Sequence, residues 1–133
     1  MSEQGCDKTV MIVEDDADVR DALAEVLEDG DYKPLLAENG AVALQELKKA
    51  SAKPPCVILL DVMMPIMDGR EFRTVQQGDP ALSSIPVIVL SAHAEASAAA
   101  AQMAAEGFLA KPVDLGTLLD TVERFCASEK RSA

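Results

Sequence analysis

Four short apolar runs of this 133-residue sequence each end in polar side chains that could do chemistry. Such runs, bounded by acids, prolines or glycines, are typical of strands buried on both faces of a parallel sheet. The carboxyl ends of parallel strands share one edge, where open α/β sheets carry their chemistry. We therefore expect these side chains to converge: Glu14 and Asp15 after the first run, Asp61 after the second, Ser91 and Lys111 after the last two.

The residue types of this group suit phosphoryl transfer to a carboxylate. Three carboxylates placed close together repel one another, and a hard divalent cation, Mg²⁺ (or Mn²⁺) rather than Ca²⁺, would relieve that repulsion. Asp61 could then act as the nucleophile, while Lys111 and Ser91 hold phosphoryl oxygens by charge and hydrogen bonding. Helix capping would explain one or two of these residues, but Lys111 lies between Ala110 and Pro112 and caps nothing.

The elements that would position these side chains alternate regularly along the chain. Strands are expected over 9–13, 33–37, 56–60, 86–90 and 107–110. Helices are expected after the first strand, where Val19, Ala22, Leu23, Val26 and Leu27 form one apolar stripe, then over 41–50, 70–77 and 94–106, and from Asp114 onward. Helical connections of this length demand parallel pairing, so the sequence predicts one α/β domain of five β–α units.

Composition argues against several classes of partner. The chain has 23 Asp and Glu against 12 Lys and Arg, and its net charge of −11 disfavours a nucleic-acid surface or adsorption to anionic membranes. No apolar run approaches the roughly 20 residues of a membrane span, and the polar N-terminus lacks the apolar segment of a signal peptide. The three cysteines (Cys6, Cys56, Cys126) are far apart, so we interpret them as free thiols, buried or idle, in a cytoplasmic protein.

These motifs resemble the receiver domain of two-component response regulators. The resemblance covers about residues 10–125 and rests on Val13-Glu14-Asp15-Asp16, on Asp61-Val62-Met63-Met64-Pro65 with Met67-Asp68-Gly69, on Ser91-Ala92 and on Lys111-Pro112. It implies a flavodoxin-like (βα)5 three-layer sandwich with a five-stranded parallel sheet in the order 2-1-3-4-5. The receiver would span 9–127, between an extended or disordered segment 1–8 and a short tail 128–133. No segment after Phe125 could form an output module, so a free-standing receiver, or one cut from a longer chain, is expected.

The resemblance also implies a metal site around the phosphoacceptor. Asp61 would accept the phosphoryl group. Asp15 would be the direct acidic ligand and Glu14, which replaces the more usual aspartate, would act through water. The backbone carbonyl of Met63 would complete the set, and Mg²⁺ or Mn²⁺ would be the ion.

A second set of residues would bind the phosphoryl group or change conformation when it is present. Lys111 would bind the phosphoryl group and be followed by a cis Lys111–Pro112 bond. Ser91, in place of the common threonine, would be the switch hydroxyl. Phe108, in place of the common tyrosine, would be the aromatic that follows the switch without a phenol hydrogen bond.

Two further positions would set the lifetime of the acyl phosphate. Met63 and His93 occupy the places that tune hydrolysis in this family. Methionine cannot polarise water, so the resemblance implies a long-lived phosphoryl group, and we interpret His93 as a surface residue rather than a phosphate carrier.

Signalling would run through protein contacts. The phosphoryl group would come from a sensor histidine kinase or a histidine phosphotransfer protein. The inward movement of the Ser91 hydroxyl and of Phe108 would reshape the face formed by the fourth helix, fifth strand and fifth helix, and a downstream protein would bind there. Neither nucleic acid nor membrane is expected as a partner.

Two other classes of function stay open at this point. An aspartate-nucleophile phosphatase or dehalogenase would want a second carboxylate two residues beyond the nucleophile, where Met63 stands. A non-phosphorylated pseudo-receiver acting as a scaffold is opposed by the intact acidic pair, acceptor and lysine. A phosphoacceptor signalling domain, not an enzyme in its own right, is therefore the favoured prediction.

Overall fold

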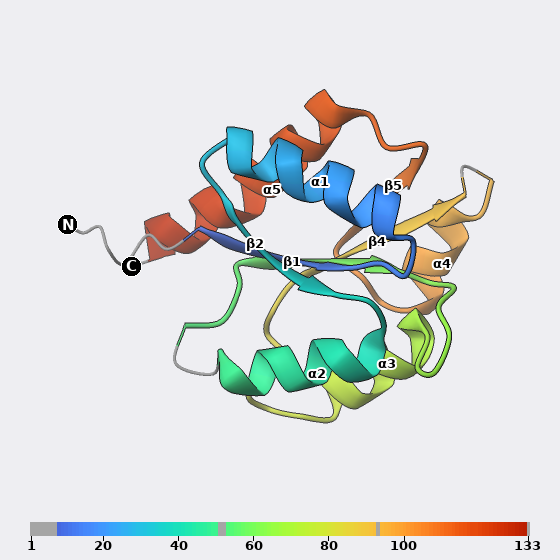
Figure 1. Cartoon of the computed structure of the whole chain (residues 1–133). Helices are drawn as coiled ribbons and strands as arrows, with labels where there is room; N and C mark the ends of the chain where they lie inside the picture. Colours follow the sequence, from blue (N-terminus) through green and yellow to red (C-terminus); the bar gives the residue numbers. More distant parts are fainter. Residues whose placement is uncertain (1–7, 51–52, 93, 133) are drawn as a thin grey trace.

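A computed structural model describes residues 8–50, 53–92 and 94–132 (Figure 1). In this part of the chain five strands alternate with five helices. Their bounds are β1 (Thr9–Val13), α1 (Ala17–Asp29), β2 (Lys33–Ala37), α2 (Gly40–Lys49), β3 (Val57–Asp61), α3 (Gly69–Gln77), β4 (Val87–Ala92), α4 (Ala96–Gln102), β5 (Gly107–Lys111) and α5 (Leu115–Ser132).

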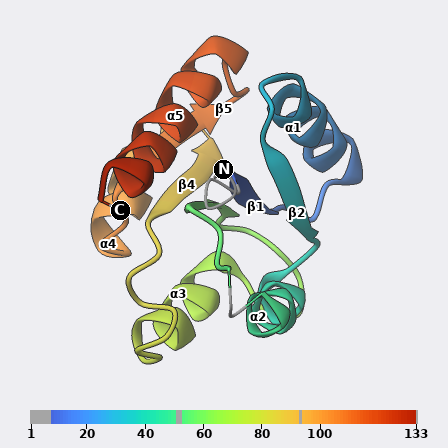
Figure 2. The same cartoon turned by 90° about the vertical axis from the view of Figure 1, so that its left-hand side faces the viewer.

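The strands form one parallel sheet in the order β2-β1-β3-β4-β5. Figure 2 views the molecule from the end where β1 begins and shows the sheet between two layers of helices: α1 and α5 cover one face, and α2 and α3 cover the other. α4 packs beside β4 and β5 on the side of α2 and α3, since Ala99, Ala100 and Met103 share their apolar cluster. The flavodoxin-like three-layer fold predicted from the sequence is confirmed.

Burial on both faces explains the continuous apolar runs. Every residue of β1 and of β3 is buried. Successive side chains point to opposite faces, so Ile58 and Leu60 join the cluster under α2 and α3, whereas Val57 and Leu59 join the one under α1 and α5. A strand with helices on both sides needs no polar face, which leaves its carboxyl end as the place for polar chemistry.

α4 is shorter than the sequence predicts, and α5 is longer. The alanine-rich segment predicted as a helix over 94–106 is helical only from Ala96 to Gln102. Ala104 then adopts a left-handed backbone (φ 54°), and the buried guanidinium of Arg73 on α3 binds the carbonyls of Met103 (2.9 Å) and Ala104. The backbone closes α4 at this point, because the N–H groups of Ala104 and Ala105 donate back to the carbonyls of Ala101 (3.3 Å) and Ala100 (2.9 Å). The predicted tail 128–133 continues α5 to Ser132, while segment 1–7 lies outside the described residues.

The cysteine interpretation is wrong for two of the three residues. Cys56, directly before β3, and Cys126, on α5, form a disulfide with Cα atoms 5.3 Å apart, although 70 residues separate them in sequence. Both are buried in the cluster under α1 and α5. Their distance along the chain hid a contact that only the packing of α5 on the sheet creates. Cys6 lies outside the described residues.

Reducing this disulfide is expected to lower the free energy of unfolding by about 3–4 kcal/mol, because the bond closes a long loop in the unfolded chain. Cys56 Sγ lies 3.3 Å from the carbonyl oxygen of Thr9, so the reduced thiol keeps a hydrogen-bond acceptor and adds little cost of its own. Urea unfolding with and without reductant, in a Cys6→Ser background, measures the difference. The doubly substituted Cys56→Ala/Cys126→Ala chain is the control, and its stability should not respond to reductant. Equal midpoints for oxidised and reduced protein would contradict the prediction.

Candidate functional site

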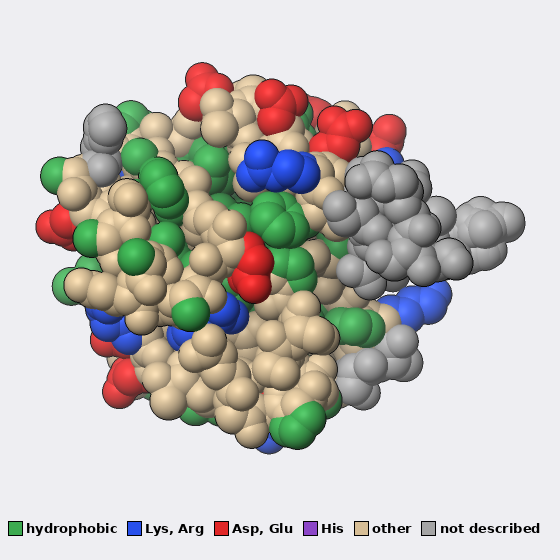
Figure 3. Space-filling model, turned by 180° about the vertical axis from the view of Figure 1, so that it is seen from behind, with side chains coloured by type: hydrophobic (Ala, Val, Ile, Leu, Met, Phe, Trp, Pro, Cys, Tyr) green, Lys and Arg blue, Asp and Glu red, His purple; other side chains and the backbone are tan. Residues whose placement is uncertain are grey.

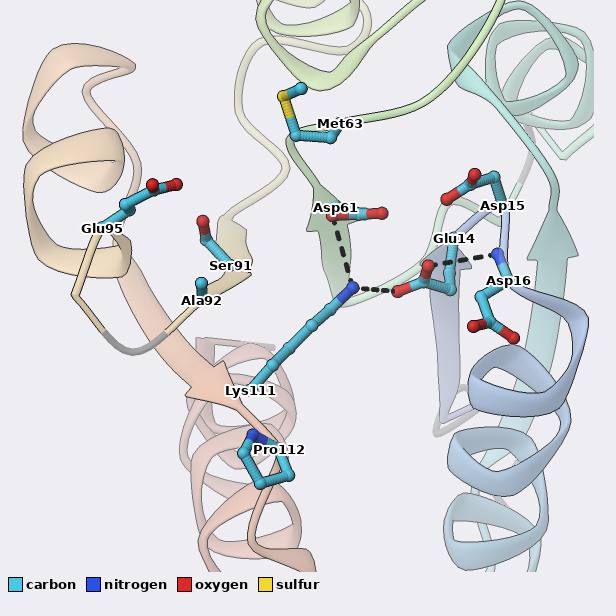
Figure 4. A pocket seen from close by; sticks show the side chains of 10 residues that line it. All are labelled: Glu14, Asp15, Asp16, Asp61, Met63, Ser91, Ala92, Glu95, Lys111 and Pro112. Carbon is cyan, nitrogen blue, oxygen red and sulfur yellow. Dashed lines mark hydrogen bonds and ion pairs between the residues drawn. The ribbon is translucent and has the colours of Figure 1, made fainter.

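An open cavity of about 620 Å³ lies at the carboxyl ends of β1, β3, β4 and β5 (Figure 4). The five polar residues expected to converge all line it. The complete lining is Glu14, Asp15, Asp16, Asp61, Met63, Ser91, Ala92, Glu95, Lys111 and Pro112. No role in the site was predicted from the sequence for Glu95, or for Asp16 beyond its place in one of the motifs.

Lys111 joins two of the carboxylates. Its Nζ lies 2.8 Å from Glu14 Oε1 and 3.4 Å from Asp61 Oδ1. Glu14 and Asp61 are buried, whereas the lysine reaches them from the cavity wall with its side chain 29% exposed (Figure 4). The side chain of Lys111 therefore extends from β5 and places its positive charge between Glu14, which follows β1, and Asp61, which ends β3. The bond after it, Lys111–Pro112, is cis, as predicted.

The electrostatics of the cavity favour a proton or a cation on Asp61. Burial, together with the neighbouring charge of Glu14, raises the pKa of the Asp61 carboxyl to about 7 even though the charge of Lys111 lowers it. For Lys111, burial works against the charged form, but the hydrogen bond to Glu14 and the charge of Asp61 outweigh it and raise the lysine pKa. One lysine therefore does not neutralise the acids around it.

The acids fit a divalent cation. One carboxylate oxygen from each of Glu14, Asp15 and Asp61 can be chosen so that all three lie within 4.8 Å of one another. Glu14 Oε1 is buried, and its contact in the described part of the chain is the Lys111 ammonium, 2.8 Å away. A buried acceptor with spare capacity and three clustered carboxylates are what Mg²⁺ or Mn²⁺ would need from the protein. Met63 lies at the same cavity, with its side chain 75% exposed.

Local contacts hold the acidic loop after β1 in place. Asp16 caps α1 by accepting from the backbone N–H groups of Asp18 (2.9 Å) and Val19 (3.3 Å). Arg20 on α1 donates through Nη1 to the carbonyl oxygen of Glu14 (2.8 Å). Arg20 was missed in the sequence, because an arginine on an exposed part of a helix gives no sign that it turns back to a carbonyl.

Gly69 holds the loop after Asp61. Its N–H donates to the carbonyl oxygen of Val62 (2.9 Å), and Asp68 and Glu71 form a capping box that starts α3. A Cβ at Gly69 would lie 2.9 Å from Val62 Cα and closer still to the Asp61 carbonyl oxygen, both of them backbone atoms. The chain can return this close to Asp61 only where no side chain intervenes.

Gly69→Ala is therefore expected to lower the free energy of unfolding by about 1–3 kcal/mol, because the backbone of the Asp61 loop must shift. Gly78→Ala is the matched control: a Cβ there would have no neighbour closer than 3.6 Å, and the change should be near neutral. Urea unfolding of the two variants beside the parent protein measures both. Equal effects of the two substitutions would contradict the close approach at Gly69.

The two residues predicted to report the phosphorylated state are placed differently. Ser91, at the end of β4, is buried and lines the cavity. Phe108 on β5 lies outside it, with its side chain 47% exposed. His93 lies outside the described residues.

Five parallel strands in the order 2-1-3-4-5, with an acidic cavity and a lysine at their carboxyl edge, define a doubly wound α/β protein that carries its chemistry at that edge. The family described as the response regulator receiver domain matches residues 10–123 of this chain. The chain therefore belongs to the response regulator receiver domain family. Such domains are typically non-enzymatic phosphoacceptors of two-component signalling, and their partners are histidine kinases.

Individual proteins support the same assignment. The chain is 36% identical over 118 residues to the DNA-binding transcriptional regulator NtrC of Escherichia coli, covering 86% of this chain but only 24% of NtrC. A putative response regulator from Chloroflexus aurantiacus has a TM-score of 0.81 and 30% identity, covering 90% of this chain and 98% of that one. The receiver domain of the sensor histidine kinase PA1611 from Pseudomonas aeruginosa, solved with magnesium in its active site cleft, shares the fold at a TM-score of 0.77 and 22% identity, covering 90% and 98%. Within the described residues, no helix combines the length and the apolar character that a membrane crossing requires.

Proposed function

We propose that this chain is a phosphoacceptor in which Asp61 takes a phosphoryl group from a sensor histidine kinase or a histidine phosphotransfer protein. The observation that carries the proposal is the setting of Asp61: a buried carboxyl at the end of a central strand, 3.4 Å from Lys111 Nζ and clustered with Glu14 and Asp15. An acceptor, a positive group and a cation-binding set within one open cavity are the parts that phosphoryl transfer to a carboxylate requires.

The transfer itself requires little general acid–base catalysis by the protein. One Asp61 oxygen forms a bond to phosphorus as the bond from phosphorus to the donor's histidine nitrogen breaks, and that nitrogen keeps the electron pair. Lys111 and the Ser91 hydroxyl hold the phosphoryl oxygens, and Asp61 must be ionised to attack. Mg²⁺ or Mn²⁺, held by Glu14, Asp15, Asp61 and the Met63 carbonyl, would supply the positive charge that ionises Asp61 and neutralises the phosphoryl oxygens.

The phosphorylated state would be signalled to a downstream protein through the face formed by α4, β5 and α5. Seen from that side, hydrophobic side chains are interspersed with basic and acidic ones across the middle of the molecule, and further acidic side chains lie along its upper rim (Figure 3). Phe108 is exposed on β5, and α4 packs on the sheet through the small side chains of Ala96, Ala99 and Ala100, with Met103 buried directly after it. A thinly packed helix beside Ser91 could shift when Ser91 turns toward a phosphoryl oxygen, and a downstream protein would bind the changed face.

Incubation with acetyl phosphate, with and without Mg²⁺, tests the proposal by intact-protein mass spectrometry. We expect a gain of one phosphoryl group that requires the metal and is absent in Asp61→Asn. Sustained turnover of the donor without a stable adduct would favour a phosphatase-like enzyme instead. No adduct under any condition would favour a scaffold, and either result contradicts the proposal.

A further inference from the structure

Glu95 faces the cavity without a role in the proposed transfer. It stands immediately before α4, on the wall across from Glu14 and Asp15, and its carboxylate points toward the space between Ser91 and Met63 (Figure 4). Its backbone is held, since its N–H donates to the Ala92 carbonyl and its own carbonyl accepts from Ala99, both at 2.9 Å.

The side chain of Glu95 has no structural task in the described chain. It occupies the N-cap position of α4, where a side-chain oxygen often caps the helix, yet it makes no capping bond. Among the described residues it forms no hydrogen bond and no ion pair. A carboxylate with a fixed backbone and an unused side chain is therefore available to whatever enters the cavity.

The position of Glu95 matters because of the direction from which water attacks during hydrolysis of the phosphoryl group. Water attacks the phosphorus of an acyl phosphate in line, from the side opposite the oxygen that leaves. Because Asp61 is buried at the end of β3, that side faces the mouth of the cavity, whose exposed lining includes Met63 and Glu95. The thioether of Met63 is at best a weak acceptor, and Glu14 and Asp15 lie beside Asp61, in the cation-binding set.

We propose that Glu95 positions the attacking water and thereby sets the lifetime of the phosphoryl group on Asp61. The proposal rests on the function proposed above. The carboxylate of Glu95 accepts a hydrogen bond from the water. The water oxygen bonds to phosphorus as the bond from phosphorus to the Asp61 oxygen breaks, the electron pair returns to the Asp61 carboxylate, and the water proton leaves with inorganic phosphate. Glu95 acts on the water and not on Asp61, so it should affect loss of the phosphoryl group and not its uptake.

The test compares phosphoryl loss in Glu95 variants after acetyl phosphate is removed by desalting. Glu95→Ala should slow the loss about tenfold, somewhat less than full proton transfer to a base typically provides. Glu95→Gln keeps an acceptor oxygen without the charge and should slow it only severalfold, and Glu95→Asp should restore part of the rate. Glu25→Ala, which removes an exposed acid from α1, should leave the rate unchanged. The rate of uptake should be the same in all five proteins.

Three results would overturn the inference. Loss at the parental rate in Glu95→Ala would show that the carboxylate does not act on the water. Faster loss would show that it protects the phosphoryl group. Equal slowing in Glu95→Ala and Glu95→Gln would show that charge, not an acceptor, is what matters. If the parent protein takes up no phosphoryl group, the proposed function itself fails, which separates the two failures.

Discussion

Asp61→Asn is expected to raise the free energy of unfolding of the metal-free protein at pH 8, by about 1–3 kcal/mol after allowance for solvent screening, while removing its ability to take up a phosphoryl group. The raised pKa of Asp61, about 7 against an ordinary 3.8, means that the folded protein holds an unfavourable charge at that pH. Asparagine keeps the shape of the side chain without the charge, and Lys111 keeps its closer ion pair with Glu14. A variant that is more stable and yet inactive is the signature of a group retained for function.

The same shift predicts a pH dependence of stability. Because the pKa of Asp61 is higher in the folded than in the unfolded state, the folded protein binds more protons between about pH 4 and 7, and this group's contribution to stability falls as the pH rises through that window. Above about pH 7 the contribution is constant. Asp61→Asn should lack this slope, whereas Asp120→Asn, at an exposed position on α5, should keep it. Urea unfolding in chelator across this range measures the slopes, and parallel profiles for the parent protein and Asp61→Asn would contradict the prediction.

Lys111→Met is expected to slow phosphoryl uptake by a hundredfold or more while strengthening Mg²⁺ binding. Removing one group that stabilises developing charge commonly costs about 10²–10³ in rate. The ammonium of Lys111 lies 2.8 Å from Glu14 and 3.4 Å from Asp61, so it competes with a cation for the same carboxylates. Its loss therefore frees negative charge for the metal while it removes the contact to the phosphoryl group.

Isothermal titration with Mg²⁺ and rates of uptake from acetyl phosphate measure the two effects separately. Lys49→Met is the control, since Lys49 is exposed on α2 and pairs with Glu46. A fall in both quantities would mean that Lys111 supports the cavity structurally. If the rate of phosphoryl uptake does not change in Lys111→Met, Lys111 takes no part in the reaction.

The fold and most of the cavity were predictable because their signals are local. A run such as 56–60 is short, wholly apolar and bounded by prolines and an acid, which favours a strand covered on both faces with the acid at its carboxyl end. Parallel pairing then brings Glu14, Asp61 and Lys111 together, although about 50 residues separate each from the next.

The features that escaped prediction depend on contacts between distant residues or on the direction of a side chain. Arg73 binds the carbonyls of the two residues that follow α4, 30 and 31 residues further along the chain, and no helical periodicity reveals this contact. The Cys56–Cys126 disulfide depends on how α5 lies across the sheet. Glu95 has the sequence signature of an exposed residue at a helix start, and only its orientation into the cavity distinguishes it.

The central claim, that Asp61 carries the phosphoryl group, is tested most directly by locating the modification. Protein phosphorylated with acetyl phosphate and Mg²⁺ is treated with borohydride, which reduces an aspartyl phosphate to homoserine, and is then digested and sequenced by mass spectrometry. The account predicts homoserine at position 61. Homoserine at another aspartate, or a phosphate that survives on a serine or threonine with Asp61 unchanged, would contradict it.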